Sequence, residues 1–581
     1  MRFRVLALDY DGTSAQGGKL HPEVRAAVND ARAHGIAVIL VTGRILAELR
    51  REVGDLQFLD AVVAENGAVL AFPSTGRSLT LAPPPPASFL EELRRRGITA
   101  VAGQCVIEAE ASMAPCVLDA IREGELPLVI LFNRSRLMIL PQAVSKGTGL
   151  REALSALRLS PHNAIAIGDA ENDHSLLAAC EVGVAVSWGS PALQTAADEV
   201  LKGSDPTAVA AYIRKVTAAL RLPQARKQRQ LLLGTTEDGQ QLTLTVRGRN
   251  ILIAGDSGSG KSWVMGMLCE QLILHRYSVC VIDPEGDYAT LESLPGVVVF
   301  GDEGPRHFRD LERAFRYPEA SVVLDLSTMS PAERSEYVPS LLEMLAVIRR
   351  HTGLPHRIVV DEAHYYLYGP EARQALDLDL AAYALVTYQV SRLDPSVLHA
   401  SEAIIVTHES DPAEIHALYA LFGGPGMEAE WRATIEGLAT HEAALLPTLE
   451  KPGSRLRTFR VAPRLTSHVR HRHKYLDVPV SPGSAFVFTW GGVPTGQQAR
   501  TLAEFVAMAS ACSPEVLQEH LRRHDFSRWI GEVFRDPSLA SQVRRLEARR
   551  DLIHESEIKM ALAKLIWERY LLPAPTESNP S

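Results

Sequence analysis

The stretch Asp9-Tyr10-Asp11-Gly12-Thr13 directly follows an apolar run at residues 5–8, near the start of the 581-residue chain. The apolar run predicts a buried strand, which places both carboxylates just past the end of that strand. In open α/β sheets, ligands bind at the carboxyl ends of the strands. Two carboxylates at positions i and i+2 can divide a phosphoryl transfer, because one attacks phosphorus while the other moves a proton. Taken alone, the stretch fits an acidic structural turn about as well.

The sequence around this stretch alternates between two patterns. Residues 1–205 alternate short apolar runs with amphipathic stretches, as in RVLAL, EVRAAVNDARAHG and IAVILV. This rhythm predicts a parallel sheet covered by helices. Four consecutive prolines at residues 83–86 interrupt the rhythm and predict the boundary of an inserted subdomain. We place that subdomain at about residues 83–140.

Three later segments supply further groups suited to phosphate and to a metal ion. Thr42 follows the run IAVILV and offers a hydroxyl to a phosphate oxygen, and Lys146 precedes a predicted helix and can neutralise phosphate charge. The segment Gly168-Asp169-Ala170-Glu171-Asn172-Asp173 follows the run NAIAI and offers the hard oxygen ligands that Mg²⁺ prefers. Together with Asp9 and Asp11, these segments predict a phosphoryl-transfer site.

These four pieces, in this order, resemble the haloacid dehalogenase (HAD) superfamily, and Glu65-Asn66-Gly67-Ala68 is typical of its Cof-like phosphatase branch. The resemblance covers about residues 1–205 and implies that Asp9 is a nucleophile forming an aspartyl-phosphate, with Asp11 as general acid/base. It also implies that the inserted segment is a cap that selects substrate. The implied phosphate ligands are Thr42, Lys146 and Asn172, and the implied Mg²⁺ ligands are Asp9, Asp169, Asp173 and a backbone carbonyl of Asp11. A scaffolding domain without activity is the alternative, and the intact motif residues argue against it.

A second constellation begins at the apolar run NILIA, residues 250–254, which leads into GDSGSGKS and the helical stretch WVMGMLCEQLIL. This is a GxxxxGKS loop between a strand and a helix, where backbone N–H groups wrap phosphates at a helix N-terminus. Lys261 is expected to reach the β- and γ-phosphates of ATP, and Ser262 is expected to bind Mg²⁺. The predicted ATP-binding residues are Gly255, Asp256, Ser257, Gly258, Ser259, Gly260, Lys261, Ser262 and Gln389.

Three segments accompany this loop. The run RIVVDEAH at residues 357–364 ends an apolar strand in Asp361, a carboxylate for the Mg²⁺ shell, and Glu362, which polarises water. Glu362 therefore indicates hydrolysis as well as binding. The run VIDPEGDY at residues 281–288 closes another strand. Thr387-Tyr388-Gln389 closes a further one, where Gln389 is placed to sense the γ-phosphate.

This set resembles the HerA/FtsK group of P-loop ATPases, and HerA-like proteins in particular, over about residues 231–450. The resemblance implies a RecA-like domain in a ring, usually a hexameric DNA pump, with an arginine from the neighbouring subunit in each site. Two departures weaken the expectation of DNA translocation more than that of ATP binding. The HAD domain replaces the usual β-barrel, of which residues 231–246 are at most a remnant. Val390-Ser391 stands where Arg-Pro is common, so the trans arginine stays unassigned, with Arg392 as a candidate.

The connecting and C-terminal regions are less informative. Residues 206–230 read as a basic linker, and residues 451–474 hold eight Lys or Arg and no acid. The latter segment fits a solvated connector better than a nucleic-acid surface. Helical patterns follow from about residue 496, so residues 451–581 are expected to form a basic connector and a helical domain of unknown role. His520, His524, Asp525 and Trp529 share a predicted helical face there, which fits packing better than a metal site.

Composition narrows the class of protein. Apolar residues make up 46% and charged residues 22% of the chain, which is ordinary globular usage and excludes a disordered or collagenous protein. The formal charge of −9 excludes a wholly basic nucleic-acid protein. The six cysteines form no CxxC pair, so neither a zinc site nor a disulfide framework is indicated. The chain starts without a signal-peptide pattern and has no transmembrane run, so cytoplasm is the expected location.

The sequence therefore predicts an α/β protein: a HAD Rossmann-like domain with a small cap, a RecA-like P-loop ATPase domain, and a mainly helical C-terminal domain. The leading hypothesis is a Mg²⁺-dependent phosphatase of small phosphorylated substrates, governed by the ring assembly or ATP cycle of a HerA-like ATPase. One alternative is a nucleic-acid motor with an end phosphatase in repair or defence, and another is a nucleotide-switched scaffold. The expected partners are further copies of the chain, most often as a hexamer, with nucleic acid an open option and no membrane.

Overall fold

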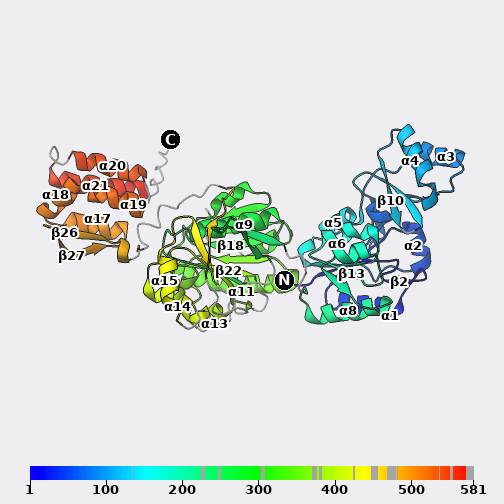
Figure 1. Ribbon diagram of the computed structural model, residues 1–581, viewed down its shortest axis with the longest axis horizontal. Helices are drawn as coiled ribbons and strands as arrows, with labels where there is room; N and C mark the ends of the chain where they lie inside the picture. The colour runs from blue at the N-terminus through cyan, green and yellow to red at the C-terminus, as the bar shows by residue number, and fades with distance from the viewer. Residues whose placement is uncertain are drawn as a thin grey trace, which may run out of the picture. The chain divides into compact units, whose positions relative to one another are not determined.

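The computed structural model describes residues 1–133, 135–223, 229–246, 250–301, 308–369, 376–378, 382–422, 426–446, 456–466, 479–480, 482–534, 537–549 and 554–570. Figure 1 shows the chain coloured by residue number. One compact unit comprises Met1–Arg229 with Glu312–Glu319 and Val347–His356, and the other comprises Gln230–Leu311, Ala320–Ala346 and Arg357–Ser581. Each unit is built around its own large sheet.

The first unit contains an eight-stranded sheet of order β14-β13-β12-β1-β4-β5-β6-β7. Its strands pair in parallel except at β6 and β7, which are antiparallel. The strands are β1 (Val5–Asp9), β4 (Ala37–Val41), β5 (Ala61–Ala64), β6 (Val69–Phe72), β7 (Arg77–Thr80), β12 (Ala164–Gly168), β13 (Val182–Val186) and β14 (Glu199–Leu201). A small hairpin, β2 (Ala15–Gln16) and β3 (Lys19–Leu20), follows β1.

Helices cover both faces of this sheet because side chains of a strand alternate between its faces. Leu6 and Leu8 of β1 pack into a core with helices α1 (Pro22–Ala33) and α8 (Pro206–Ala219). Val5 and Ala7 point to the opposite core, with α5 (Lys146–Ala156), α6 (His174–Ala179) and α7 (Pro191–Ala196). Residues 206–219, expected within a basic linker, thus form a helix whose apolar side is buried in this unit. Residues 224–228 of that linker lie outside the described residues.

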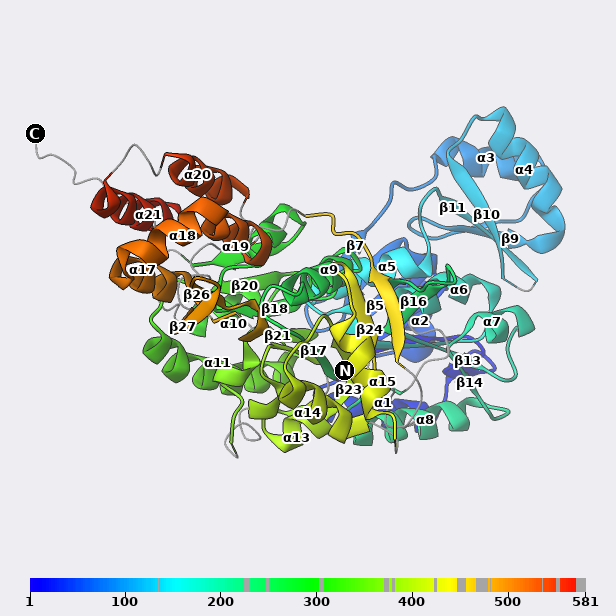
Figure 2. The same ribbon diagram turned by 60° about the vertical axis from the view of Figure 1, so that its left-hand side comes forward.

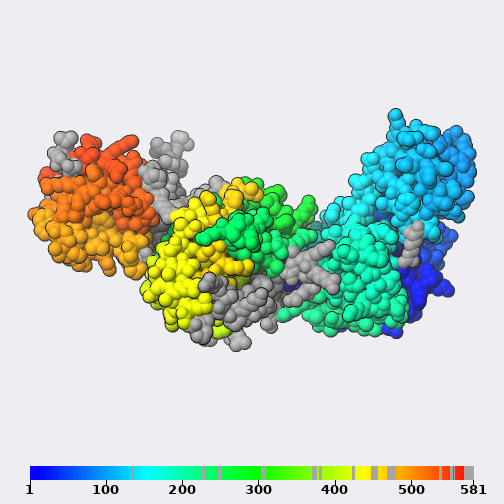
Figure 3. Space-filling view, in the orientation of Figure 1, coloured from blue at the N-terminus to red at the C-terminus, as the bar shows by residue number. Residues whose placement is uncertain are grey.

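The segment between β7 and α5 forms a small cap. Its sheet has the order β10-β11-β9-β8 and is antiparallel, with its helices on one face (Figure 2). In Figure 3 the cap stands out from the rest of the first unit as a lobe. Its elements are α3 (Ala87–Arg95), β8 (Val101–Ala102), β9 (Ile107–Glu110), α4 (Ala114–Glu123), β10 (Leu128–Asn133) and β11 (Arg136–Pro141).

The second unit contains an eleven-stranded sheet of order β16-β15-β25-β24-β23-β17-β22-β21-β18-β20-β19. The strands from β23 to β19 in this order pair in parallel. Residues 457–461, expected in the connector, form β25 within it. The strands are β15 (Gln230–Thr235), β16 (Gln241–Thr245), β17 (Asn250–Ala254), β18 (Val279–Asp283), β19 (Val297–Phe300), β20 (Ser321–Asp325), β21 (Arg357–Val360), β22 (Tyr383–Thr387), β23 (Ser401–Val406), β24 (Glu442–Leu445) and β25 (Arg457–Val461). The helices are α9 (Lys261–Leu274), α10 (Phe308–Ala314), α11 (Pro331–Thr352), α13 (Pro395–His399), α14 (Pro412–Phe422) and α15 (Glu428–Glu436). The last residues of α10 and α11, from 312 and from 347 onward, group with the first unit.

The C-terminal residues form a hairpin and helices around their own apolar core. His520 is buried there, where its Nε2 accepts the backbone N–H of Thr489 at 2.9 Å and its Nδ1 lies 2.8 Å from Asp525. This ring therefore holds hairpin and helices together. The elements are β26 (Phe486–Trp490), β27 (Val493–Ala499), α17 (Leu502–Ala511), α18 (Pro514–Arg523), α19 (Asp525–Val533), α20 (Pro537–Ala548) and α21 (Glu555–Tyr570).

The fold class expected from the sequence is confirmed: two α/β domains, the first with a cap, and a mainly helical C-terminal region. Among the residues that the structure describes, no helix is both long and apolar enough to span a membrane.

Candidate active sites

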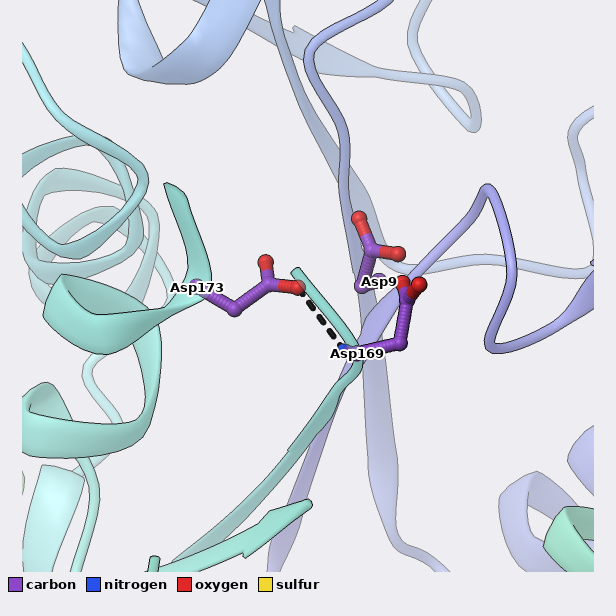
Figure 4. A group of neighbouring side chains, drawn as sticks. All are labelled: Asp9, Asp169 and Asp173. Atoms are coloured by element: carbon purple, nitrogen blue, oxygen red, sulfur yellow. Dashed lines mark hydrogen bonds between the residues drawn. The ribbon is translucent and has the colours of Figure 1, made fainter. Parts of the chain in front are cut away.

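The first candidate site lies at the carboxyl edge of the first sheet. Strand β1 ends at Asp9, which pairs with Val41, so that Thr42 follows on the neighbouring strand. On the other side β12 ends at Gly168, directly before Asp169. Parallel pairing thus brings three segments that are distant in sequence to one edge. Figure 4 shows Asp9, Asp169 and Asp173 pointing toward one another.

Lys146, the first residue of α5, provides the cation of this site. Its Nζ lies 2.6 Å from a carboxylate oxygen of Asp9 and 2.6 Å from one of Asp173. Helix α5 is fixed in place at its start, because Ser145 and Thr148 cap each other's backbone N–H groups. The buried ammonium group is therefore held between the two carboxylates.

The three carboxyl groups of this site can carry more negative charge than the single ammonium group of Lys146 neutralises. Ligand oxygens of Asp9, Asp169 and Asp173 lie within 4.8 Å of one another, and all three side chains are buried. Burial and the neighbouring Asp173 raise the pKa of Asp9 well above its ordinary value, although Lys146 opposes the shift. A buried excess of carboxylate oxygens suits a small divalent cation, since it offers hard oxygen ligands and charge to be neutralised. The described residues at this edge therefore fit Mg²⁺.

Asp11 is oriented by an arginine from the next strand's loop. Arg44 donates from Nε and Nη2 to the two Asp11 oxygens, both at 2.7 Å. These bonds raise the pKa of Arg44, because Asp11 favours its charged form. Such a two-pronged pair fixes the plane of a carboxylate as well as its position. Arg44 is held in turn by Glu52.

The predicted phosphate ligands sit on loops that are bonded together. The Thr42 hydroxyl accepts the N–H of Arg44 at 3.1 Å. Asn172 donates from Nδ2 to the side-chain oxygen of Asn66 at 3.2 Å. Asn66 itself donates its N–H to the Thr42 carbonyl at 3.0 Å. The structure thus brings Thr42 and Asn172 to the same edge as Asp9 and Lys146.

A cavity of about 650 Å³ opens beside Asp11 and Asp169. Other parts of its wall come from the β2–β3 hairpin, from Glu171 and Trp188, and from the start of α8. Trp188 is fixed there because its indole N–H donates to the Gly12 carbonyl at 2.8 Å. The site is therefore open to a ligand on its Asp11 side.

The second candidate site is the loop of residues 255–262 between β17 and α9. Gly255, Gly258 and Gly260 have φ values of 144°, 78° and 107°, a region that favours glycine. Lys261 is buried, and its Nζ donates to the Asp256 carbonyl at 2.8 Å. The ammonium group thus lies over the loop that would receive phosphates.

A neighbouring acid contributes little negative charge to this loop at neutral pH. Glu409 follows the end of β23 and is buried. Burial and a hydrogen bond with Asp256 raise the pKa of Glu409 to about 9. The group therefore stays protonated where negative charge would oppose a phosphate.

The loop serine is bonded to an acid from another strand. Ser262 donates its hydroxyl to Asp287 at 2.7 Å. Asp283 shapes the loop that carries Asp287, because its carboxylate accepts the backbone N–H groups of residues 285–288. Residues 281–288 therefore join the phosphate loop directly.

The remaining predicted residues lie at the ends of β21 and β22. Asp361 and Glu362 follow β21 and are buried, and Glu362 adopts a φ of 48°. Gln389 follows β22 and is half-buried; its side-chain oxygen accepts from Arg392 at 3.3 Å. The neighbouring Tyr388 ring lies 5.9 Å from the Lys261 ammonium. The carboxyl ends of these strands therefore face the phosphate loop.

Comparison with known proteins identifies both classes of domain. Residues 6–80 and 120–213 match the family model for haloacid dehalogenase-like hydrolases, and residues 234–352 match that for the central domain of helicase HerA. The chain thus contains a HAD-like hydrolase domain followed by a HerA-like domain, as the motifs indicated.

Curated relatives match the first domain. The phosphoglycolate phosphatase of Methanopyrus kandleri is 27% identical over 227 residues, which cover 36% of this chain and 96% of the relative. That of Methanothermobacter thermautotrophicus is 27% identical over 216 residues, 36% of this chain and 98% of the relative. Among solved structures, a haloacid dehalogenase-like hydrolase from Bacteroides thetaiotaomicron is 18% identical with a TM-score of 0.33, covering 37% of this chain and 100% of its own.

Sequence reasoning assigned no role to three residues that the structure ties to these sites. Arg44 binds Asp11, Asp287 binds Ser262, and Glu65 binds the cap. Glu65 and Asp287 stand in motifs quoted above, and Arg44 lies two residues after Thr42. A polar residue near a strand end, next to motif residues of known chemistry, was the available signal.

Proposed function

We propose that the first domain is a Mg²⁺-dependent phosphomonoester phosphatase in which Asp9 is the nucleophile. The observation that carries the proposal is the buried cluster of Asp9, Asp169 and Asp173 around Lys146. Asp9, Asp169, Asp173 and the Asp11 carbonyl would hold Mg²⁺, which supplies positive charge to the transferring phosphoryl oxygens. Lys146 supplies a second, fixed positive charge to the same oxygens.

The residues divide the reaction into two displacements. An Asp9 oxygen attacks phosphorus, the bond to the leaving oxygen breaks, and Asp11 gives that oxygen a proton. Water then attacks the aspartyl-phosphate, Asp11 takes a proton from the water, and phosphate leaves with Asp9 regenerated. Thr42 and Asn172 hold the phosphoryl oxygens, and the pair with Arg44 fixes the plane of the Asp11 carboxyl group.

Small phosphorylated metabolites are the substrates we propose, with phosphoglycolate first because it names the relatives' activity. The test measures phosphate release from phosphoglycolate, sugar phosphates, nucleotides and phosphorylated DNA ends, with Mg²⁺ and with EDTA. Turnover that needs Mg²⁺ and is absent in Asp9→Asn supports the proposal. Turnover that survives in Asp9→Asn would overturn it.

We propose a second activity, the binding and hydrolysis of ATP, for the HerA-like domain. Its support is the phosphate loop in which Lys261 lies over the loop and Ser262 is bonded to Asp287. Ser262 and Asp361 would hold Mg²⁺, Glu362 would orient the attacking water, and Gln389 would sense the γ-phosphate. Titration of a fluorescent ATP analogue in Mg²⁺ and in EDTA tests this site. Affinity unaffected by Lys261→Ala would argue against it.

We further propose that the ATP cycle or assembly of the second domain governs the phosphatase. The two sites share one chain but use separate sheets and separate motifs. Comparing phosphatase rates with and without ATP tests this link, and Lys261→Ala serves as the control. Salt-dependent DNA binding with DNA-stimulated ATP hydrolysis would instead favour the nucleic-acid motor. The basic stretch at residues 451–474 was weighed above as a nucleic-acid surface, and most of it lies outside the described residues.

A further inference from the structure

The cap contacts the rest of the first unit, here called the catalytic body, through more than its two chain connections. The loop between β8 and β9, residues 103–106, reaches back to the body. Cys105 and Val106 of this loop are buried in the body's core together with Met138 and Leu140 of β11. The Cys105 thiol also donates to the carbonyl of Ala82, at the start of the cap, at 3.2 Å.

One carboxylate organises this contact. Glu65, in the 3₁₀ turn Glu65–Gly67 after β5, is fully buried. Its Oε1 accepts the N–H of Gln104 at 3.0 Å, and its Oε2 accepts those of Cys105 and Val106 at 2.7 and 3.1 Å. Hydrogen bonds to a charged acceptor are stronger than neutral ones. Glu65 therefore satisfies three successive backbone donors of the cap.

The loop is shaped to receive this carboxylate. A Cβ at Gly103 would lie 2.7 Å from the Glu65 carboxyl atoms, so glycine gives the side chain the space it occupies. On the body side, Glu65 and Asn66 have φ values of 53° and 55°. Non-glycine residues adopt such values uncommonly, and here the arrangement turns Glu65 toward the cap.

The same short turn touches the catalytic loops. The N–H of Glu65 donates to the Arg44 carbonyl at 3.0 Å, and Asn66 bonds both Thr42 and Asn172. Gly67, the next residue in the chain, packs closely against Ser145, which directly precedes Lys146. A Cβ atom added to Gly67 would lie 2.0 Å from the Ser145 carbonyl oxygen. Residues 65–67 thus connect the cap loop to the segments that carry the predicted phosphate ligands.

The cap sheet in turn places side chains near these loops. Glu108 of β9 and Met138 of β11 are opposite each other in the register, so they share one face of the sheet. Met138 packs against Gly43, the residue after Thr42. A Cβ atom added to Gly43 would lie only 3.2 Å from the Met138 Cε. Glu108 is buried on that face and accepts from Arg136 at 2.7 Å. A leaving group at the catalytic edge would meet this face.

We propose that Glu65 is a positioning residue that latches the cap to the catalytic body. It thereby holds the Glu108 and Met138 face of the cap at one place over the reacting groups. Recognition of the leaving group then uses a fixed surface, without a swing of the cap in each turnover. The kinetic part of this proposal rests on the phosphatase activity proposed above, whereas the latch itself does not.

Hydrogen–deuterium exchange tests the latch in the full-length protein. In Glu65→Ala and Glu65→Gln, the amides of residues 104–106 are expected to exchange at least about tenfold faster, because they lose charged acceptors. The glutamine of Glu65→Gln keeps the size of the side chain, but its NH₂ group cannot accept the backbone N–H groups that the lost carboxylate oxygen accepted. Asp60→Asn is the matched control, since Asp60 accepts the N–H of Val38 and binds Arg32 without touching the cap. Unchanged exchange at 104–106 in a folded Glu65 variant would overturn the proposal.

Kinetics provide the second readout. A cap that is no longer fixed should lower kcat/KM for the preferred natural substrate about tenfold, because misplaced contacts cost orientation. For p-nitrophenyl phosphate, which needs fewer cap contacts, the loss should stay within about threefold. Equal losses for both substrates would show a general structural role and overturn the proposal that the latched cap positions the leaving group. If the wild type hydrolyses neither substrate, the phosphatase proposal fails while the exchange result still decides the latch.

Discussion

The ammonium group of Lys146 lies 2.6 Å from a carboxylate oxygen of Asp9, with both side chains buried. A second carboxylate, that of Asp173, stands equally near. Burial alone would lower the pKa of Lys146, but Asp173 and Asp9 raise it well above its ordinary value. The lysine therefore stays charged and holds both carboxylates in place before any ligand binds.

Lys146→Met tests the structural and the chemical part of this arrangement together. Removing one partner of a buried ion pair typically costs about 3–5 kcal/mol, so the free energy of unfolding of the first domain should fall by that amount. Phosphatase activity should fall on the order of 10³-fold or more, because a fixed charge on the phosphoryl oxygens is lost. Urea unfolding and phosphate release measure the two effects. The exposed Lys202→Met is the control, and equal stability of the two variants would contradict the expectation.

Asp9→Asn should abolish phosphatase activity and leave ATP hydrolysis intact. The substitution keeps the shape of the side chain but removes the nucleophilic oxygen, so the covalent path is lost at a cost on the order of 10⁴-fold or more. Phosphate release from a phosphomonoester and from ATP, measured on one preparation, separates the two sites. Asp60→Asn, a change of the same kind outside the site, should retain both activities. More than a few per cent residual phosphatase in Asp9→Asn would exclude the nucleophile assignment.

Magnesium should stabilise the first domain more strongly as the pH rises. Burial and Asp173 raise the pKa of Asp9, so without metal the folded state favours a bound proton. That stability is present at low pH and is lost as the pH rises through the raised pKa. Mg²⁺ can replace the proton, so the increase of Tm that Mg²⁺ gives over EDTA should grow as the pH rises above the ordinary pKa of an aspartate. Asp169→Asn should weaken the increase of Tm that Mg²⁺ gives. An increase of Tm that is independent of pH would contradict the proposed site.

The sequence predicted which side chains meet at the carboxyl edge of the first sheet, because one rule sufficed there. Asp9, Thr42 and Asp169 each follow a buried strand, and neighbouring parallel strands end at the same edge of a sheet. In the structure β1 lies between β12 and β4, so the ends of the three strands are adjacent. Lys146 is the first residue of a helix and directly follows no strand, so its charge and its place at the start of that helix singled it out.

The remaining contacts depend on features that a linear pattern does not carry. Ser262 and Asp287 meet although β17 and β18 are separated by β22 and β21 in the sheet. Strand β25 joins the central sheet by pairing with β24 and β15, which its local sequence does not specify. Contacts such as these are set by tertiary packing, which overrides local propensity.

Two variants of the phosphate loop site should separate ATP binding from ATP hydrolysis. Lys261→Ala removes the charge that faces the β- and γ-phosphates, so both binding and turnover should be lost. Glu362→Gln keeps the loop and Lys261 but loses the carboxylate that orients water, so it should bind ATP and hydrolyse it on the order of 10²-fold more slowly or worse. A fluorescent nucleotide titration and a phosphate-release assay give the two readouts. Normal turnover in Glu362→Gln would rule out its role as the water-orienting residue.

A HerA-like site is expected to take its final positive charge from a second subunit. Such a head-to-tail contact is heterologous and closes into a ring where the rotation permits. We expect a ring, most often a hexamer, despite the repulsion of a −9 charge per chain. Arg392 is the candidate for the arginine supplied in trans, since it is exposed.

Mixing two inactive variants tests both parts of this prediction. Arg392→Ala and Lys261→Ala should each lack ATP hydrolysis. In mixed rings, some sites pair an intact phosphate loop with an intact Arg392 of the next subunit, so activity should return when subunits exchange. Native mass measurement with a slowly hydrolysed ATP analogue gives the oligomeric state of the same samples. A wild-type monomer that hydrolyses ATP would exclude the ring, and rings without regained activity would exclude Arg392 as the residue acting in trans.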